Sequence, residues 1–213
     1  MHHNYISAGG AQRMSRFDEC LKIVLKHEGG WANHPSDPGG ATMKGVTIAV
    51  FERFKGRDVT HAELLAISDE DLKAIYRKGY WDKVRGDQLP RGLDLVAFDA
   101  AVNSGPSQGA KWLQRAVAAV DDGKIGPDTI AAAHSIDAVI AINNACDRRL
   151  AMLRGLSTWH AFGRGWTARV DDIRVQALGM AGRAERGPGL RQRPTRGFWA
   201  EFAEAFRGIF RGN

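Results

Sequence analysis

Apolar residues recur along most of the chain at intervals of three and four positions, and stretches that alternate apolar and polar residues are scarce. This spacing places apolar side chains on one face of a helix, so the pattern predicts an all-α protein. Helices are expected over residues 16–27, 48–54, 69–79, 93–103, 108–120, 128–133, 137–154 and 165–180. Ser68 and Pro127 stand where residues that cap or open a helix are favoured, which supports two of these starts.

The first of these helices carries an acid at the end of its apolar stripe. Phe17, Leu21 and Val24 share one face, and Glu28 falls about 20° from Phe17 at 100° per residue. Burial beside apolar side chains and the negative end of the helix dipole both favour a protonated carboxyl group. A carboxyl group that keeps its proton near neutral pH can act as a general acid. The alternative interpretation is an exposed acid at a frayed helix end, or an acid paired with Lys26 or His27.

The segment that follows, residues 29–47, is rich in glycine and polar residues, which indicates a shaped loop. It supplies a second carboxylate, Asp37, and an aromatic plane, Trp31, of the kind that stacks on sugar rings. An acid, a second carboxylate and an aromatic wall are the groups that cleave glycosidic bonds. Asp37 also suits an ordinary turn, because a proline and two glycines follow it.

Residues 27–47, HEGGWANHPSDPGGATMKGVT, resemble the signature of glycoside hydrolase family 108. That signature is Glu-Gly-Gly-aromatic, followed by Asp-x-Gly-Gly-x-Thr-x-x-Gly-(Ile or Val)-Thr. Residues 96–132 and 162–173 are similar to the small peptidoglycan-binding unit that accompanies it. The family contains phage and prophage endolysins with N-acetylmuramidase (lysozyme) activity. The resemblance implies a lysozyme-like helical fold and a hydrolase, without cofactor or metal, that cleaves the β-1,4 bond between N-acetylmuramic acid and N-acetylglucosamine in peptidoglycan.

The resemblance also implies the roles of three residues. Glu28 matches the family's catalytic glutamate and becomes the general acid, while Asp37 and Thr42 match the acid and the threonine of the loop. The interval from Glu28 to Asp37 agrees with the Glu-Asp-Thr triad of phage lysozymes, in which Thr42 would stand one residue early. Direct attack by Asp37 on the sugar would retain the anomeric configuration. Activation of a water molecule by Asp37 and a threonine hydroxyl would invert it.

The residues expected to contact the substrate are Trp31, Asn33, Thr47 and Asn103. Asn103 stands at a sharp turn between two expected helices, and its amide group offers both a donor and an acceptor to an N-acetyl group. Capping of a helix end beside Gly105 is the other interpretation of Asn103.

The chain divides into five expected regions. They are a disordered extension (1–15), a catalytic muramidase region (16–92), a helical peptidoglycan-binding region packed on it (93–180), a linker rich in Arg, Gly and Pro (181–197), and a C-terminal amphipathic helix (198–213). The last helix has a strongly aromatic face. It is expected to dock on the main domain, to pair with another protein, or to bind an anionic membrane or lipopolysaccharide surface.

The charge is concentrated in that tail. The whole chain has 30 basic and 24 acidic residues, a net charge of +6, and residues 183–213 contribute +4 of it. Because the body is nearly neutral, we expect no nucleic-acid partner and assign the tail's charge to delivery at an anionic cell envelope. A monomer is expected. Cys20 and Cys146 lack metal-site spacing and are expected to be buried thiols.

Neither a membrane-spanning run nor a secretion signal is apparent in the sequence. We therefore expect the protein to stay in the cytoplasm until a holin releases it to the periplasm. Two other functions stay open. A lytic transglycosylase also uses one glutamate but forms 1,6-anhydro sugars, and a non-catalytic peptidoglycan-binding or secretion-accessory protein would leave Glu28 inert.

Overall fold

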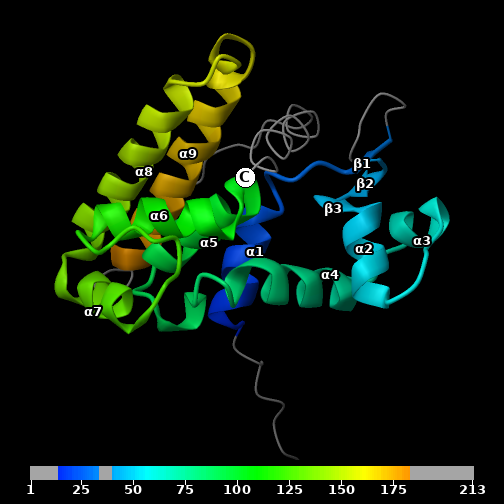
Figure 1. The fold of residues 1–213 in the computed structure, drawn as a ribbon, viewed down its shortest axis with the longest axis horizontal. Helices are drawn as coiled ribbons and strands as arrows, with labels where there is room; N and C mark the ends of the chain where they lie inside the picture. Colours follow the sequence, from blue (N-terminus) through cyan, green and yellow to red (C-terminus); the bar gives the residue numbers. More distant parts are fainter. Residues whose placement is uncertain (1–13, 34–39, 183–213) are drawn as a thin grey trace, which may run out of the picture.

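A computed structural model describes residues 14–33 and 40–182, which form a mostly helical protein (Figure 1). The α-helices are α1 (Arg16–Val24), α2 (Ile48–Lys55), α3 (His61–Leu65), α4 (Asp69–Tyr76), α5 (Leu93–Ser104), α6 (Pro106–Ala116), α7 (Pro127–Ser135), α8 (Ala138–Arg154) and α9 (Trp159–Gly182). A π-helical turn, Arg77–Trp81, extends α4, and a short 3-10 helix, Gly86–Gln88, precedes α5. The predicted all-α, lysozyme-like fold class is confirmed.

A small antiparallel sheet follows α1. Its strands are β1 (Trp31–Ala32), β2 (Thr42–Met43) and β3 (Val46–Thr47), in the order β1-β2-β3. Ala32 lies opposite Thr42, and Thr42 lies opposite Thr47. The segment predicted as a shaped loop therefore contains a hairpin, whose two-residue turn brings β3 back beside β2.

Helix α5 lies at the centre of the molecule. Figure 1 shows the small sheet with α2 and α3 at one end, the helices α6 to α9 at the other, and α1 and α5 between them. Nearly every residue of α5 is buried, as expected of a helix that lies in the interior rather than at the surface. It contacts α1 and the turns after α4, and it also contacts α6, α8 and α9.

One continuous core of buried apolar side chains extends from Phe17 to Met180. It crosses the expected boundary between residues 92 and 93, so the regions on either side of that position share a single interior. The division at residue 92 itself stays a prediction.

The helices expected from the apolar spacing are all present, with shifted ends. Helix α1 ends at Val24, and residues 25–27 continue as a tighter turn in which the His27 amide donates to the Val24 carbonyl at 2.9 Å. The spacing does not predict α3, a five-residue helix fixed by a capping box between Thr60 and Glu63.

Both cysteines are free and buried, as predicted. Burial raises the pKa of the Cys146 thiol to about 11, so this thiol stays protonated at neutral pH. No helix within residues 14–33 and 40–182 is long and apolar enough to cross a membrane. Asp37, most of the expected N-terminal extension, most of the linker, and the helix expected over 198–213 lie outside the described residues.

Candidate active site

The carboxyl group of Glu28 lies just beyond the C-terminal turn of α1, with its side chain only 4% exposed. The apolar stripe of α1 directs it inward, since Phe17, Leu21 and Val24 are all buried. The structure thus places Glu28 inside the protein, in agreement with the face that the sequence predicts, and excludes an exposed acid at a frayed end.

The β2–β3 turn lies against this carboxyl group. Lys44 and Gly45 form the turn with φ angles of 47° and 77°, the left-handed values that a two-residue hairpin of type I′ requires. A Cβ atom on Gly45 would stand 2.6 Å from Glu28 Oε2 and 2.5 Å from the Tyr76 hydroxyl oxygen. Tyr76 in turn donates a hydrogen bond to the Lys44 carbonyl at 2.8 Å. Only glycine lets the backbone approach the acid this closely.

The other carboxyl oxygen of Glu28 accepts a hydrogen bond from a buried arginine. Arg169 of α9, with its side chain 3% exposed, donates from Nη2 to Glu28 Oε1 at 2.9 Å. Its guanidinium group also binds Asp99 of α5, through Nε at 2.9 Å and Nη2 at 2.8 Å, both to Oδ1. The positive partner of Glu28 is therefore itself fixed by a second acid.

The network continues from Asp99 to Asn103. Arg149 of α8 donates to Asp99 Oδ2 at 2.5 Å and to Asn103 Oδ1 at 2.8 Å. Asp99 and Asn103 are one helical turn apart on α5, so they present their oxygens to the same arginine. The charged groups alternate in sign along the series Glu28, Arg169, Asp99, Arg149, which we call the ion series.

Electrostatics keep the inner members of the ion series charged. Burial by itself raises the pKa of Asp99, but the guanidinium groups of Arg169 and Arg149 outweigh it and hold that pKa well below its ordinary value. Burial lowers the pKa of Arg169, and the carboxylates of Asp99 and Glu28 outweigh this effect and raise it. Asp99 and Arg169 are thus both ionised at neutral pH.

The predicted threonines lie opposite each other in the sheet and are buried, Thr42 at 5% and Thr47 at 3% exposure. Thr47 is also the N-cap of α2, where its hydroxyl accepts a hydrogen bond from the Val50 amide at 3.2 Å. Its side chain therefore has a structural role in addition to any contact with substrate.

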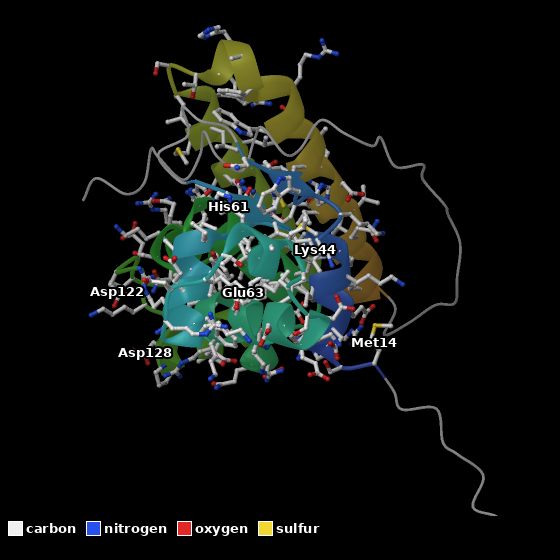
Figure 2. The ribbon with its side chains drawn as sticks, turned by 90° about the vertical axis from the view of Figure 1, so that its right-hand side faces the viewer. Met14, Lys44, His61, Glu63, Asp122 and Asp128 are labelled. Carbon is white, nitrogen blue, oxygen red and sulfur yellow. The ribbon has the colours of Figure 1, made fainter. Side chains whose placement is uncertain are left out.

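The predicted sugar contacts do not all lie in one place. Trp31 and Asn33 are exposed on β1 and just after it, and the Trp31 ring lies 6.0 Å from that of His61. Figure 2 shows His61 and Lys44, the first residue of the turn, on the same face of the molecule. Asn103, in contrast, is 8% exposed and lies inside the protein, connected to Glu28 through the ion series.

The described residues contain no group of three or more His, Cys, Asp or Glu side chains that could hold a metal ion. They do provide an oriented carboxyl group, Glu28, and an exposed aromatic ring, Trp31.

Two comparisons with known proteins found matches. A model of the glycosyl hydrolase 108 family matches residues 21–105. The solved structure of SagA from Brucella abortus is 44% identical in sequence and superimposes with a TM-score of 0.70, over 78% of this chain and 95% of SagA. The chain belongs to the glycosyl hydrolase 108 family. As a family 108 member it is a glycoside hydrolase that acts on peptidoglycan. No curated protein matches it.

The range matched by the family 108 model contains every site residue predicted from the sequence, but not Arg149 or Arg169. Sequence reasoning also missed both arginines. The signal that could have found Arg169 is its place on the apolar stripe of α9, between Trp166 and Ile173, both of which are buried. A charged residue on a core-facing stripe requires a partner, and the partner here is the candidate acid of the family 108 site.

Proposed function

We propose that the chain is an N-acetylmuramidase that cleaves the β-1,4 bond between N-acetylmuramic acid and N-acetylglucosamine, with Glu28 as the general acid. The observation that carries this proposal is the placement of the Glu28 carboxyl group. It is almost fully buried, held through Oε1 by Arg169, and its Oε2 faces the Gly45 turn beside the threonine-bearing strands. An acid fixed in this way can deliver a proton to one defined atom of a bound glycan.

The reaction would begin with proton transfer from Glu28 to the oxygen that links the two sugars. The bond from that oxygen to the anomeric carbon of N-acetylmuramic acid breaks, and N-acetylglucosamine leaves with the proton. Water finally adds to the anomeric carbon. Asp37 is our candidate for the second carboxylate, either as nucleophile or as the base that activates this water.

Among the threonines, we assign the water-holding role to Thr42. The Thr47 hydroxyl oxygen already accepts the Val50 amide, whereas Thr42 lies between Ala32 and Thr47 in the sheet. We propose Trp31 and Asn33 as sugar contacts because both are exposed, on or next to the strand that pairs with the β2–β3 hairpin. Thr47 and Asn103 are weaker candidates for direct contact, since both are buried and bonded within the protein.

We further propose that the enzyme is an endolysin, made in the cytoplasm, released through a holin and used for bacterial lysis. The basic tail, residues 183–213, would bind an anionic membrane or lipopolysaccharide. Deleting residues 183–213 should then reduce lysis of intact Gram-negative cells while hydrolysis of purified peptidoglycan stays at the wild-type level. Equal lysis of intact cells by both chains would contradict the role of the tail.

The decisive experiment is a digestion of purified peptidoglycan by wild type, by Glu28→Gln and by Glu70→Gln, which changes an exposed acid on α4. Mass spectrometry of the wild-type products should show muropeptides with reducing N-acetylmuramic acid ends. We expect Glu28→Gln to lose at least about 100-fold in rate, since general acid catalysis contributes roughly 10²–10⁴. Glu70→Gln should keep wild-type activity.

Other products would identify the alternatives. Anhydro ends would show a lytic transglycosylase, and intact sacculi with bound protein would show a peptidoglycan-binding or secretion-accessory protein. Full activity of Glu28→Gln would refute the assignment of the acid.

A further inference from the structure

The ion series gives Glu28 one fixed oxygen and one oxygen that faces the hairpin. Oε1 accepts a hydrogen bond from Arg169, whose guanidinium group has donors and no acceptor. A proton on Glu28 is therefore favoured on the other oxygen, Oε2, the atom nearest to Gly45. The arrangement distinguishes two oxygens that would be equivalent in an exposed glutamate.

Arg169 is held more firmly by Asp99 than by Glu28. Two of its nitrogens contact Asp99 Oδ1, whereas only Nη2 contacts Glu28. Asp99 is in turn fixed through Oδ2 by Arg149. The guanidinium group would thus keep its place if the Glu28 side chain moved, so Arg169 orients Glu28 rather than the reverse.

Such a network is a poor source of stability. Taking four charged side chains out of water carries a desolvation cost that their attraction often fails to exceed, and apolar residues of similar size are often as stable or more so. Because the ion series ends on the candidate acid, a role in placing that acid accounts for a costly arrangement that packing alone does not require.

We propose that Arg169, fixed by Asp99 and Arg149, is a positioning residue that holds the Glu28 carboxyl group with Oε2 as the proton-donating atom. Asp99 has a second effect, since its negative charge compensates that of Arg169 beside Glu28. This inference rests on the proposed role of Glu28 as general acid.

The charged and titratable groups around Glu28 come from α4, α5 and α9 and from the turn that follows α1. Arg169 faces it from α9, with Asp99 of α5 behind the guanidinium group. Tyr76 of α4 lies near the same point of the hairpin turn and donates to the Lys44 carbonyl. The neighbouring His27 is paired at 2.8 Å with Asp172 of α9.

The test is the pH profile of kcat/KM on soluble peptidoglycan fragments. A general acid must carry its proton, so activity falls on the alkaline side of the profile. Arg169→Met removes a positive neighbour and should move this alkaline limb up by about one pH unit or more. Asp99→Asn leaves the charge of Arg169 less compensated and should move the limb down by about half a unit. A purely structural role predicts no such opposite shifts.

Arg174→Met is the matched control. Arg174 is also on α9 and bonded to an acid, Asp147 at 2.6 Å, but it takes no part in the ion series. The alkaline limb of the Arg174→Met pH profile should coincide with that of wild type. Folding of each variant is checked by circular dichroism. If Arg169→Met or Asp99→Asn fails to fold, Arg169→Lys is tested instead. Lysine keeps the positive charge but cannot contact Asp99 and Glu28 through separate nitrogens as the guanidinium group does. This variant should lower kcat about tenfold with little change in KM.

The proposal is overturned if Arg169→Met and Asp99→Asn fold and keep the alkaline limb of wild type. It is also overturned if Arg169→Lys keeps the wild-type kcat. Failure of the proposed function is recognised separately, because it would appear as undiminished activity of Glu28→Gln. If Glu28→Gln is inactive and the alkaline limb of Arg169→Met stays at the wild-type pH, the positioning role is refuted and the role of Glu28 as the acid is not.

Discussion

Gly45 shows how one residue can be required for two separate reasons. Its φ of 77° is a conformation that other residues adopt at a cost of about 1–2 kcal/mol. The space where its Cβ would stand is also taken by Glu28 Oε2 and the Tyr76 hydroxyl. The first reason concerns the stability of the hairpin, and the second concerns the position of the candidate acid.

A comparison of two alanine variants separates these reasons. Gly56, the C-cap of α2, has a similar φ of 71° with no atom within 4 Å of an added Cβ. We expect Gly45→Ala and Gly56→Ala each to lose about 1 kcal/mol of unfolding free energy, measured by urea denaturation. Only Gly45→Ala should lose activity, by tenfold or more, because it displaces Glu28. Equal activity of the two variants would contradict the contact.

Single residues were predictable from sequence where the information is local. The face of Glu28 followed from its distance to Phe17 along one helix, because helical geometry fixes that angle. The pairing of Glu28 with Arg169 could not follow, since the two stand 141 positions apart and any buried carboxylate could have satisfied the arginine. The arginine partners of Asp99 were not foreseeable either, since they stand 50 and 70 positions away along the chain.

At the scale of elements, close packing of α5 against α6 depends on Gly109. A Cβ there would stand 2.8 Å from the Ala101 amide nitrogen, which belongs to the backbone and cannot move aside cheaply. Helix α5 carries Asp99 and Asn103, so this contact also helps to place the inner end of the ion series.

Two helical glycines allow this contact to be tested. Gly109→Ala should lower the free energy of unfolding by about 1–3 kcal/mol, because overpacking outweighs the gain in helix propensity. Gly179→Ala on α9, where nothing lies within 4 Å of the added Cβ, should instead raise it by up to about 1 kcal/mol. Thermal and urea unfolding of both variants provide the measurement, and changes of the same sign would exclude the packing argument.

Element prediction succeeded for helices long enough to show an apolar period. It missed α3 because five residues do not complete two turns. It missed the sheet because each strand has only two residues, too few to show alternation. The hairpin is instead set by the turn at Lys44 and Gly45, where lysine occupies a position that usually favours Asn, Asp or Gly.

At the scale of the whole molecule, acid–base pairs connect segments that are remote in sequence. His27 lies 2.8 Å from Asp172, and this hydrogen bond holds the pKa of Asp172 below its ordinary value. A carboxyl group whose pKa is lowered in the folded state stabilises the fold above its unfolded pKa of about 3.9. That contribution is lost as the pH falls through the folded pKa.

Stability should therefore decline with pH from about pH 4 downward, with Asp172 among the causes. We expect Asp172→Asn to lower the melting temperature at pH 7 and to narrow the difference between melting temperatures at pH 7 and pH 3. Asp171→Asn, which changes the exposed neighbour, is the control and should keep the wild-type difference. An unchanged difference in Asp172→Asn would show that the His27 pair has no part in acid unfolding. Differential scanning calorimetry measures these melting temperatures.

The distance in sequence between Glu28 and Arg169 also has a consequence for biosynthesis. The two residues are 141 positions apart, so the acid is synthesised long before the group that orients it. A nascent chain that has not yet extended through α9 contains the complete family signature but lacks a positioned acid. Formation of the catalytic centre would then have to wait until α9 has been synthesised.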